Sequence, residues 1–319
     1  MDGILFLFLA VFTIIASVKI ANYANVMDNK TNISGSFIGG IFLASVTSLP
    51  EFVTCLTATF INNPYLAIGD ILGSNIFNIF ILAIFDIIFV TKMFFKKVSH
   101  RYFYINALLV YIYVVLINSF INKDTGAFFN VGLPTIVIII FYFIYTLFLS
   151  KINDKNDVVE VKTEVRNIKI KFFIASILMI GLSICLIFCA DYIAFHHPEV
   201  SSSVIGAFLI GITTSLPEVV SVYTLLRINN FNLAFASIIG SNIFNLLILA
   251  IADICYRDGS IYFFSDNQNL LIAKVNLYIG LIVFIYLMRK RITNKFIYLL
   301  PSIAIVFIYL YLWKLLMIR

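Results

Sequence analysis

The pentapeptide Thr-Ser-Leu-Pro-Glu occurs twice inside long apolar stretches, at residues 47–51 and again at 214–218. Each copy places a proline and a carboxylate, Glu51 or Glu218, at a depth where a membrane helix would normally carry neither. A carboxylate near the middle of a bilayer is costly unless it is paired or hydrated. No Lys or Arg lies at comparable depth to neutralise these two groups. Two facing carboxylates therefore predict a bound cation.

The repeated proline indicates how such a cation is held. A proline inside a helix removes an N–H donor and displaces the carbonyl four residues earlier. We therefore expect carbonyls within 44–47 and 211–214 to lose their helical partners and to face the ion. A single proline would more simply be a structural kink, but a duplicated proline beside a duplicated glutamate favours a site. The neighbouring hydroxyls that would add oxygen ligands are Thr47, Ser48, Thr214 and Ser215.

A second repeated motif, Gly-Ser-Asn-Ile-Phe-Asn, occupies residues 73–78 and 240–245. Its serine and its last asparagine are four residues apart, so they share one helix face. Hydrogen bonding between helices is the alternative role, and we favour it for the first asparagine of each copy, Asn75 and Asn242. The side chains expected to form the second wall of the site are Ser74, Asn78, Ser241 and Asn245.

These candidate ligands are all oxygen atoms. Oxygen-rich sites suit hard ions such as Ca²⁺, whereas zinc and copper prefer nitrogen or sulfur. Two carboxylates balance one Ca²⁺ or two Na⁺. A site that either ion can fill, but not both together, is typical of an exchanger.

The composition indicates a polytopic membrane protein. Of the 319 residues, 62% are hydrophobic and 12% are charged, whereas soluble domains carry about 25% charged residues. The net charge of +6 does not indicate nucleic-acid binding, because the basic residues lie in short loops. Ten apolar segments are long enough to span a bilayer: 3–21, 36–60, 65–90, 102–121, 131–150, 169–193, 201–226, 232–254, 270–288 and 296–316.

Besides Asp191, which lies at the end of the sixth segment, three other acidic residues fall inside these segments. Asp86 and Asp253 lie near segment ends, so we interpret them as interfacial or capping residues. Asp70 lies near the start of its segment and is given at most a peripheral role. On this interpretation only Glu51 and Glu218 are deeply placed.

An internal duplication organises the chain, because residues 39–86 align without a gap with 206–253. Five segments in each half is an odd number, so the second half enters the membrane from the opposite face. We therefore expect an all-α membrane protein of ten helices in two inverted five-helix repeats, with broken helices at a midplane ion site. The repeats would be residues 1–150 and 169–319, joined by a short cytoplasmic linker, 151–168. Most Lys and Arg residues then face the cytoplasm if both termini lie outside.

At these motifs the sequence resembles the sodium/calcium exchanger family of the calcium/cation antiporter superfamily. The resemblance implies that Glu51 and Glu218 bind calcium and that Thr47 and Thr214 contribute oxygens to the same ion. It implies that sodium is served in one repeat by the Ala44 carbonyl, Ser48, Ser74 and Asn78, and in the other by Ser215, Ser241 and Asn245, with Gly211 as the mate of Ala44. Some relatives carry an aspartate in place of one inner asparagine; both are amides here, which is unlike the potassium-dependent branch.

The function expected from these features is Na⁺/Ca²⁺ antiport by alternating access, in a multi-pass protein of the plasma membrane. The alternative is a Ca²⁺/H⁺ or other cation/proton exchanger of the same superfamily, because a buried glutamate can carry a proton. A cation channel is less favoured, since duplicated halves around one occluded site are typical of carriers. We expect no enzymatic activity, no cofactor, no binding of nucleic acid and no protein partner. The expected partners are the transported Ca²⁺ and Na⁺ ions and the lipid bilayer.

Overall fold

The computed structural model describes residues 2–28, 41, 43–123, 131–150, 165–196, 200–227, 229–288 and 294–317. These residues form helices and connecting turns, and no β-strand is found among them. The helices of the first half are α1 (Asp2–Asp28), α3 (Ala44–Thr47), α4 (Leu49–Phe60), α5 (Pro64–Ile88), η2 (Val90–Lys92), α6 (Phe94–Lys97), α7 (Arg101–Asn122) and α8 (Leu133–Ser150). Those of the second half are α9 (Val165–His196), α10 (Ser202–Ile205), the π-helical turn η3 (Gly206–Ile210), α11 (Gly211–Thr214), α12 (Leu216–Arg227), α13 (Phe231–Cys255), η4 (Ile261–Phe264), α14 (Asn267–Met288) and α15 (Lys295–Met317).

The expectation of an all-helical membrane protein is confirmed, and the count of ten spans stays a prediction. Within the described residues, seven helices are long and apolar enough to cross a membrane, or eight if the pair joined at Ser215, bent by 44°, is one span. The helices α4 and α8 are apolar but shorter. Residues 151–164 of the predicted linker and 36–40 of the second predicted segment lie outside the described residues. The helix α9 already begins at Val165, inside the predicted linker.

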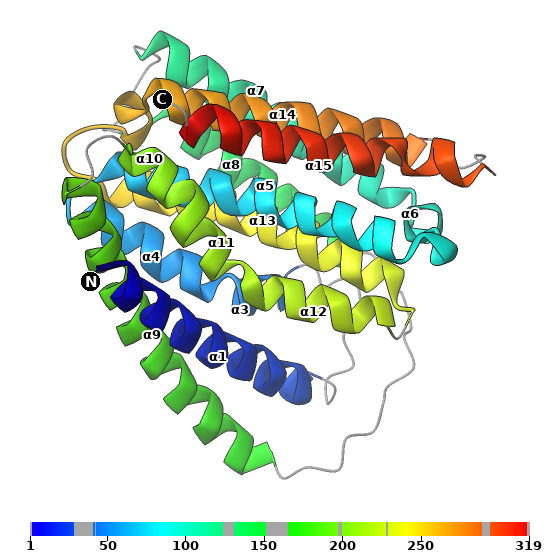
Figure 1. The fold of residues 1–319 in the computed structure, drawn as a ribbon, viewed down its shortest axis with the longest axis horizontal. Helices are drawn as coiled ribbons and strands as arrows, with labels where there is room; N and C mark the ends of the chain where they lie inside the picture. Colours follow the sequence, from blue (N-terminus) through cyan, green and yellow to red (C-terminus); the bar gives the residue numbers. More distant parts are fainter. Residues whose placement is uncertain are drawn as a thin grey trace.

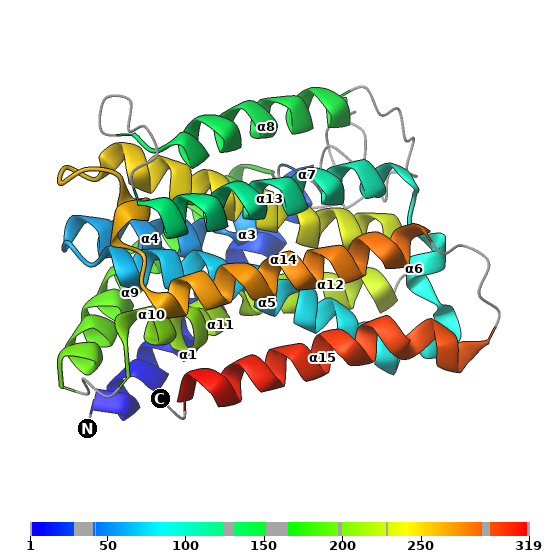
Figure 2. The same ribbon diagram turned by 90° about the horizontal axis from the view of Figure 1, so that it is seen from above.

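The two helices that carry the Gly-Ser-Asn motif, α5 and α13, form the centre of the molecule. Their apolar windows are 72% and 83% buried, compared with 44% or less for the other candidate spans. They lie side by side and run in opposite directions (Figure 1). The outer helices α8 and α15 lie on opposite sides of this pair (Figure 2), α8 against α13 and α15 against α5. Each central helix is therefore covered by an outer helix from the other half of the chain.

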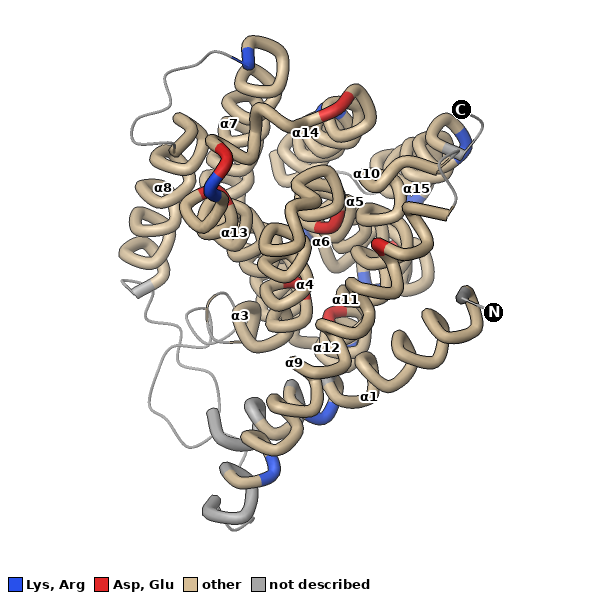
Figure 3. Tube along the Cα trace, turned by 90° about the vertical axis from the view of Figure 1, so that its left-hand side faces the viewer, with Lys and Arg blue, Asp and Glu red and all other residues tan. Residues whose placement is uncertain are grey.

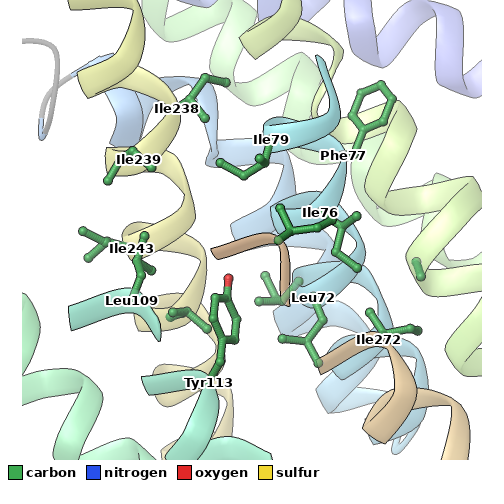
Figure 4. Packing of buried hydrophobic residues seen from close by; sticks show 14 of the residues in the cluster. Leu72, Ile76, Phe77, Ile79, Leu109, Tyr113, Ile238, Ile239, Ile243 and Ile272 are labelled. Carbon is green, nitrogen blue, oxygen red and sulfur yellow. The ribbon is translucent and has the colours of Figure 1, made fainter. Parts of the chain in front are cut away.

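Branched aliphatic side chains fill the space around the two central helices. Leu72 and Ile76 of α5 lie near Ile239 and Ile243 of α13, and the ring of Tyr113 from α7 reaches between them (Figure 4). All five side chains are buried. This apolar packing holds α5 and α13 at a fixed separation, which any site between them requires.

The prolines of the pentapeptides begin helices. Pro50 lies in the first turn of α4, where a missing N–H removes no helical hydrogen bond. The backbone leaves helical geometry at Ser48, between α3 and α4. In the second half the same break falls at Ser215, between α11 and α12. The predicted broken helices are thus present in both halves, and each glutamate lies in the first turn after a break.

A close contact between α5 and η3 gives the first testable prediction. A Cβ atom on Gly73 would lie 2.3 Å from Cα of Ala207, which is closer than real contacts allow. We expect Gly73→Ala to destabilise the protein by about 1–3 kcal/mol, because the two backbones must separate. Thermal unfolding of the purified protein in detergent measures this change.

Gly181→Ala is the matched control for this prediction, because a Cβ atom there would meet nothing within 4 Å. The close-contact interpretation is wrong if the two variants unfold at the same temperature as the original chain.

Candidate cation-binding site

Each glutamate of the repeated pentapeptide accepts a hydrogen bond from the serine of the other copy. The Ser48 hydroxyl donates to Oε1 of Glu218 at 3.1 Å, and the Ser215 hydroxyl donates to Oε1 of Glu51 at 3.0 Å. All four side chains are fully buried. Each pentapeptide therefore supplies the serine that orients the carboxylate of the other copy. Several acidic residues lie among the central helices (Figure 3).

The second oxygen of each glutamate has no hydrogen-bond partner. Oε2 of Glu51 and Oε2 of Glu218 are both buried and unpaired, and so are Oδ1 of Asn78 and Oδ1 of Asn245. A buried acceptor without a donor is costly. Four such oxygens, from four predicted ligands, form two pairs related by the sequence repeat. Oxygen atoms of this kind can be satisfied by bound cations, which attract oxygen lone pairs.

An amide network fixes the two inner asparagines. Nδ2 of Asn78 donates to Oδ1 of Asn242 at 2.9 Å, and Nδ2 of Asn245 donates to Oδ1 of Asn75 at 3.0 Å. Nδ2 of Asn75 donates to the Asn242 carbonyl at 3.2 Å, and Nδ2 of Asn242 donates to the Asn75 carbonyl at 3.1 Å. The inter-helix role predicted for Asn75 and Asn242 is confirmed. The network uses an N–H donor of Asn78 and of Asn245 and leaves their side-chain oxygens without a partner.

The predicted threonine ligands point their donors away from the carboxylates. Oγ1 of Thr47 donates to the Leu43 carbonyl, and Oγ1 of Thr214 donates to the Ile210 carbonyl, both at 3.0 Å. Each hydroxyl oxygen therefore keeps a lone pair. Oγ1 of Thr47 lies 3.5 Å from Oγ of Ser241, which places it beside the second wall of the site.

The serines of the second wall also reach across to the broken helices. The Ser241 hydroxyl donates to Oε1 of Glu218 at 3.4 Å, and the Ser74 hydroxyl donates to the Gly211 carbonyl at 3.2 Å. Ser74 therefore contacts the opposite half, whereas Ser241 contacts the glutamate of its own half. All of the predicted ligand side chains are buried, and those of Ser48, Ser215 and Ser241 donate directly to Glu51 or Glu218.

The expectation that the break frees the carbonyls is wrong for Ala44 and Gly211. The Ala44 carbonyl accepts from the Ser48 N–H at 3.0 Å, and the Gly211 carbonyl accepts from the Ser215 N–H at 3.3 Å. The missing N–H belongs to the proline, which lies two residues after each of these serines. Each also accepts from a hydroxyl, Ala44 from Thr47 and Gly211 from Ser74, both at 3.2 Å. Both lone pairs of each carbonyl oxygen are therefore in use, and an ion would have to replace one of these donors. They are bonded carbonyls at the ends of α3 and α11.

The capping interpretation holds for Asp253, which accepts from the N–H of Ile261 at the start of η4, but not for Asp86, which accepts from side-chain hydroxyls. Both are fully buried. Asp86 accepts from the hydroxyls of Tyr286, Tyr298 and Ser302, on α14 and α15. Asp86 therefore ties α5 to the outer helices of the other half.

Asp253 has the same role at the other end of the central pair. It accepts from the Gly132 N–H and the Thr135 hydroxyl, at 2.8 and 2.6 Å, and from the Ser260 hydroxyl and the Ile261 N–H, both at 2.8 Å. Asp253 thereby joins α13 to the start of α8 and to the turn before α14. Both acids are occupied by protein donors, so neither is a free cation ligand.

Asp70, to which the sequence gives at most a peripheral role, is a third buried aspartate. Its side chain is fully buried, and Oδ2 accepts from the Thr54 hydroxyl at 2.5 Å. Its position in the repeat gives it a serine mate, Ser237, so comparison of the two halves offered no paired carboxylate. Among the described residues no group of three or more His, Cys, Asp and Glu side chains could hold a metal ion. Any ion between the halves must therefore use hydroxyl, amide or carbonyl oxygens as well.

Comparison with known proteins finds relatives by sequence. The family model described as sodium/calcium exchanger protein matches residues 3–151 and 169–317. An uncharacterized membrane protein of Methanocaldococcus jannaschii is 28% identical over 223 residues, which cover 66% of this chain and 68% of that protein. CaxA of Alkalimonas amylolytica, named as a candidate antiporter, is 28% identical over 236 residues, which cover 70% of this chain and 71% of CaxA.

Solved structures share the fold. Native YfkE matches with a TM-score of 0.72 at 14% identity and covers 100% of this chain and 93% of its own. The H⁺/Ca²⁺ exchanger CAX matches with a TM-score of 0.67 at 13% identity, over 99% of this chain and 89% of its own. The sodium–calcium exchanger NCX_Mj matches with a TM-score of 0.60 at 19% identity, over 96% of this chain and 95% of its own. At these identities the likeness concerns the arrangement of the helices.

Proposed function

Because the chain belongs to the sodium/calcium exchanger protein family, we propose that it is a secondary active antiporter that exchanges Na⁺ for Ca²⁺ by alternating access. Membership in this family makes the chain a multi-pass membrane transporter and not an enzyme. The observation that carries the proposal is the set of four buried oxygens without donors, from Glu51, Asn78, Glu218 and Asn245. Transported Ca²⁺ would bind between the two glutamates.

The two charges decide how the site works. Glu51 and Glu218 together balance one Ca²⁺, whose six to eight oxygen ligands the surrounding hydroxyls, amides and carbonyls can complete. Sodium ions would displace Ca²⁺ because the same carboxylates neutralise them. The proposed ligands are Glu51, Glu218, Thr47, Thr214, Ser48, Ser215, Ser74, Asn78, Ser241, Asn245 and the carbonyls of Ala44 and Gly211.

We propose that the architecture is two inverted repeats of five helices, residues 1–150 and 169–319, joined by a cytoplasmic linker. The reciprocal hydrogen bonds Ser48–Glu218 and Ser215–Glu51 support it, because a two-fold relation exchanges equivalent contacts. The opposite directions of α5 and α13 also support it (Figure 1). The basic residues favour the plasma membrane with both termini outside.

Two candidate functions differ in the ion that is exchanged for Ca²⁺. The hydroxyl and amide oxygens around the glutamates favour Na⁺, which needs several neutral oxygens. A Ca²⁺/H⁺ exchanger is the second candidate, and the fold is shared with solved exchangers named for H⁺ and for sodium. The occluded surroundings of both glutamates, which are fully buried, disfavour an open channel.

Uptake of radioactive calcium into vesicles that contain the purified protein tests the coupling. A sodium gradient, outward from sodium-loaded vesicles, should drive uptake, and choline-loaded vesicles should show little. Uptake that ignores the sodium gradient but stops when a pH gradient is collapsed would replace this proposal with proton coupling.

A further inference from the structure

Ten buried side-chain atoms of the described residues have no hydrogen-bond partner, and six of them form three pairs related by the sequence repeat. Two pairs belong to the proposed site: Oε2 of Glu51 with that of Glu218, and Oδ1 of Asn78 with that of Asn245. The third pair is Oδ1 of Asp70 with Oγ of Ser237. The repeat aligns Asp70 with Ser237 at the same offset that aligns the ligands. The third pair is therefore one more position of the same repeated arrangement.

Asp70 lies on the ligand face of α5. It is one helical turn before Ser74 and two turns before Asn78, so the three side chains share a face. The Thr54 hydroxyl of α4, three residues after Glu51, donates to Oδ2 of Asp70 at 2.5 Å. The same Thr54 hydroxyl lies 3.1 Å from the carbonyl oxygen of Glu51, so it links Asp70 to the first turn of α4. Asp70 is thus next to the calcium site that we propose, toward the beginning of α5.

The carboxylate of Asp70 has no counterpart in the second half, where the equivalent residue is Ser237. Both Asp70 and Ser237 are fully buried, but only Asp70 has a charge to balance. Its side-chain hydrogen bond comes from a neutral hydroxyl, and Oδ1 stays unpaired. A buried carboxylate in this state requires either a cation or a proton. One carboxylate matches one monovalent charge.

We propose that Asp70 forms a separate site for one monovalent cation, Na⁺, beside the calcium site. Oδ1 of Asp70 would be the charged ligand, and the Thr54 oxygen would lie against the same ion. This inference rests on the proposed function, because it places the sodium site beside the glutamates that we propose bind calcium. It would give the first half a sodium site that the second half, with Ser237, lacks.

The test is the stabilisation of the purified protein by Na⁺, measured as a thermal shift with choline chloride replacing sodium chloride at constant ionic strength. We expect Asp70→Asn to raise the half-saturating Na⁺ concentration on the order of tenfold. Asparagine copies the shape of a protonated aspartate, so an unchanged value would show that Asp70 holds a proton and not Na⁺. Asp70→Ser copies the second half, where serine is already accommodated, and provides the same loss of charge if Asp70→Asn does not fold.

Asp258→Asn is the matched control, because it makes the same change on an exposed loop residue. It should leave the Na⁺ concentration dependence unchanged. The readout does not depend on calcium flux, so loss of the Na⁺ response in both Asp70 variants would support the site even if the protein did not exchange calcium. Values within twofold of the original chain in both Asp70 variants would overturn it.

Discussion

Replacing either Glu51 or Glu218 with glutamine is expected to lower calcium transport by about a hundredfold or more. A single remaining carboxylate cannot balance a dehydrated divalent ion in a buried site, where charge interactions are stronger than in water. Glutamine keeps the size of the side chain, and its oxygen can still accept the bond from Ser215 or Ser48. The loss should therefore come from charge and not from misfolding. Calcium uptake into vesicles, normalised to the amount of folded protein, measures it.

Asp258→Asn is the control for this prediction as well, since it removes an exposed carboxylate of the same charge. It should transport calcium at the rate of the original chain. Near-normal transport in either glutamine variant would mean that calcium binds elsewhere. A strong loss in one variant with little change in the other would mean that the two halves do not share one ion.

Asp253→Ala is expected to destabilise the protein by about 3 kcal/mol or more. The side chain accepts four hydrogen bonds, from Gly132, Thr135, Ser260 and Ile261. Leaving a buried donor unpaired costs about 1–3 kcal/mol, and several donors would be affected together. Thermal unfolding in detergent measures the change. The variant should lose stability even in the absence of calcium and sodium.

Asp258→Ala removes a nearby exposed carboxylate and should unfold within about 0.5 kcal/mol of the original chain, as surface changes usually do. Equal stabilities for Asp253→Ala and Asp258→Ala would show that Asp253 does not anchor α8. In that case the hydrogen bonds of Asp253 would not contribute to the free energy of unfolding.

The repeated motifs made much of the candidate site predictable. Duplicated residues can be paired by counting, so Glu51 and Glu218 could be placed opposite one another, and Asn75 and Asn242 could be assigned to helix contact. The proline also predicted a broken helix. The expectation that carbonyls within 44–47 and 211–214 lose their helical partners fails for Ala44 and Gly211. These two accept from the N–H groups of Ser48 and Ser215, which lie two residues before each proline and are unaffected by it.

The hydrogen bonds of Asp86 and Asp253 could not be predicted, because their partners come from outside the repeated stretches. Asp86 is bonded by tyrosines and a serine of α14 and α15, which carry no repeated motif. The distance of a residue from the end of its segment along the sequence was a poor guide to its burial, because neighbouring helices extend past the segment end. Asp70 received at most a peripheral role from the sequence because its mate in the repeat is a serine. An unpaired oxygen on each member of that pair becomes visible only in three dimensions.

The central claim is that the two pentapeptides hold one calcium ion between them. Equilibrium binding of radioactive calcium to the purified protein, in sodium-free buffer, tests it most directly. The account predicts one bound calcium per chain in the original protein and none, at the same concentration, in Glu51→Gln or in Glu218→Gln. Two calcium ions per chain, with one retained in each single variant, would show two independent sites and would contradict it.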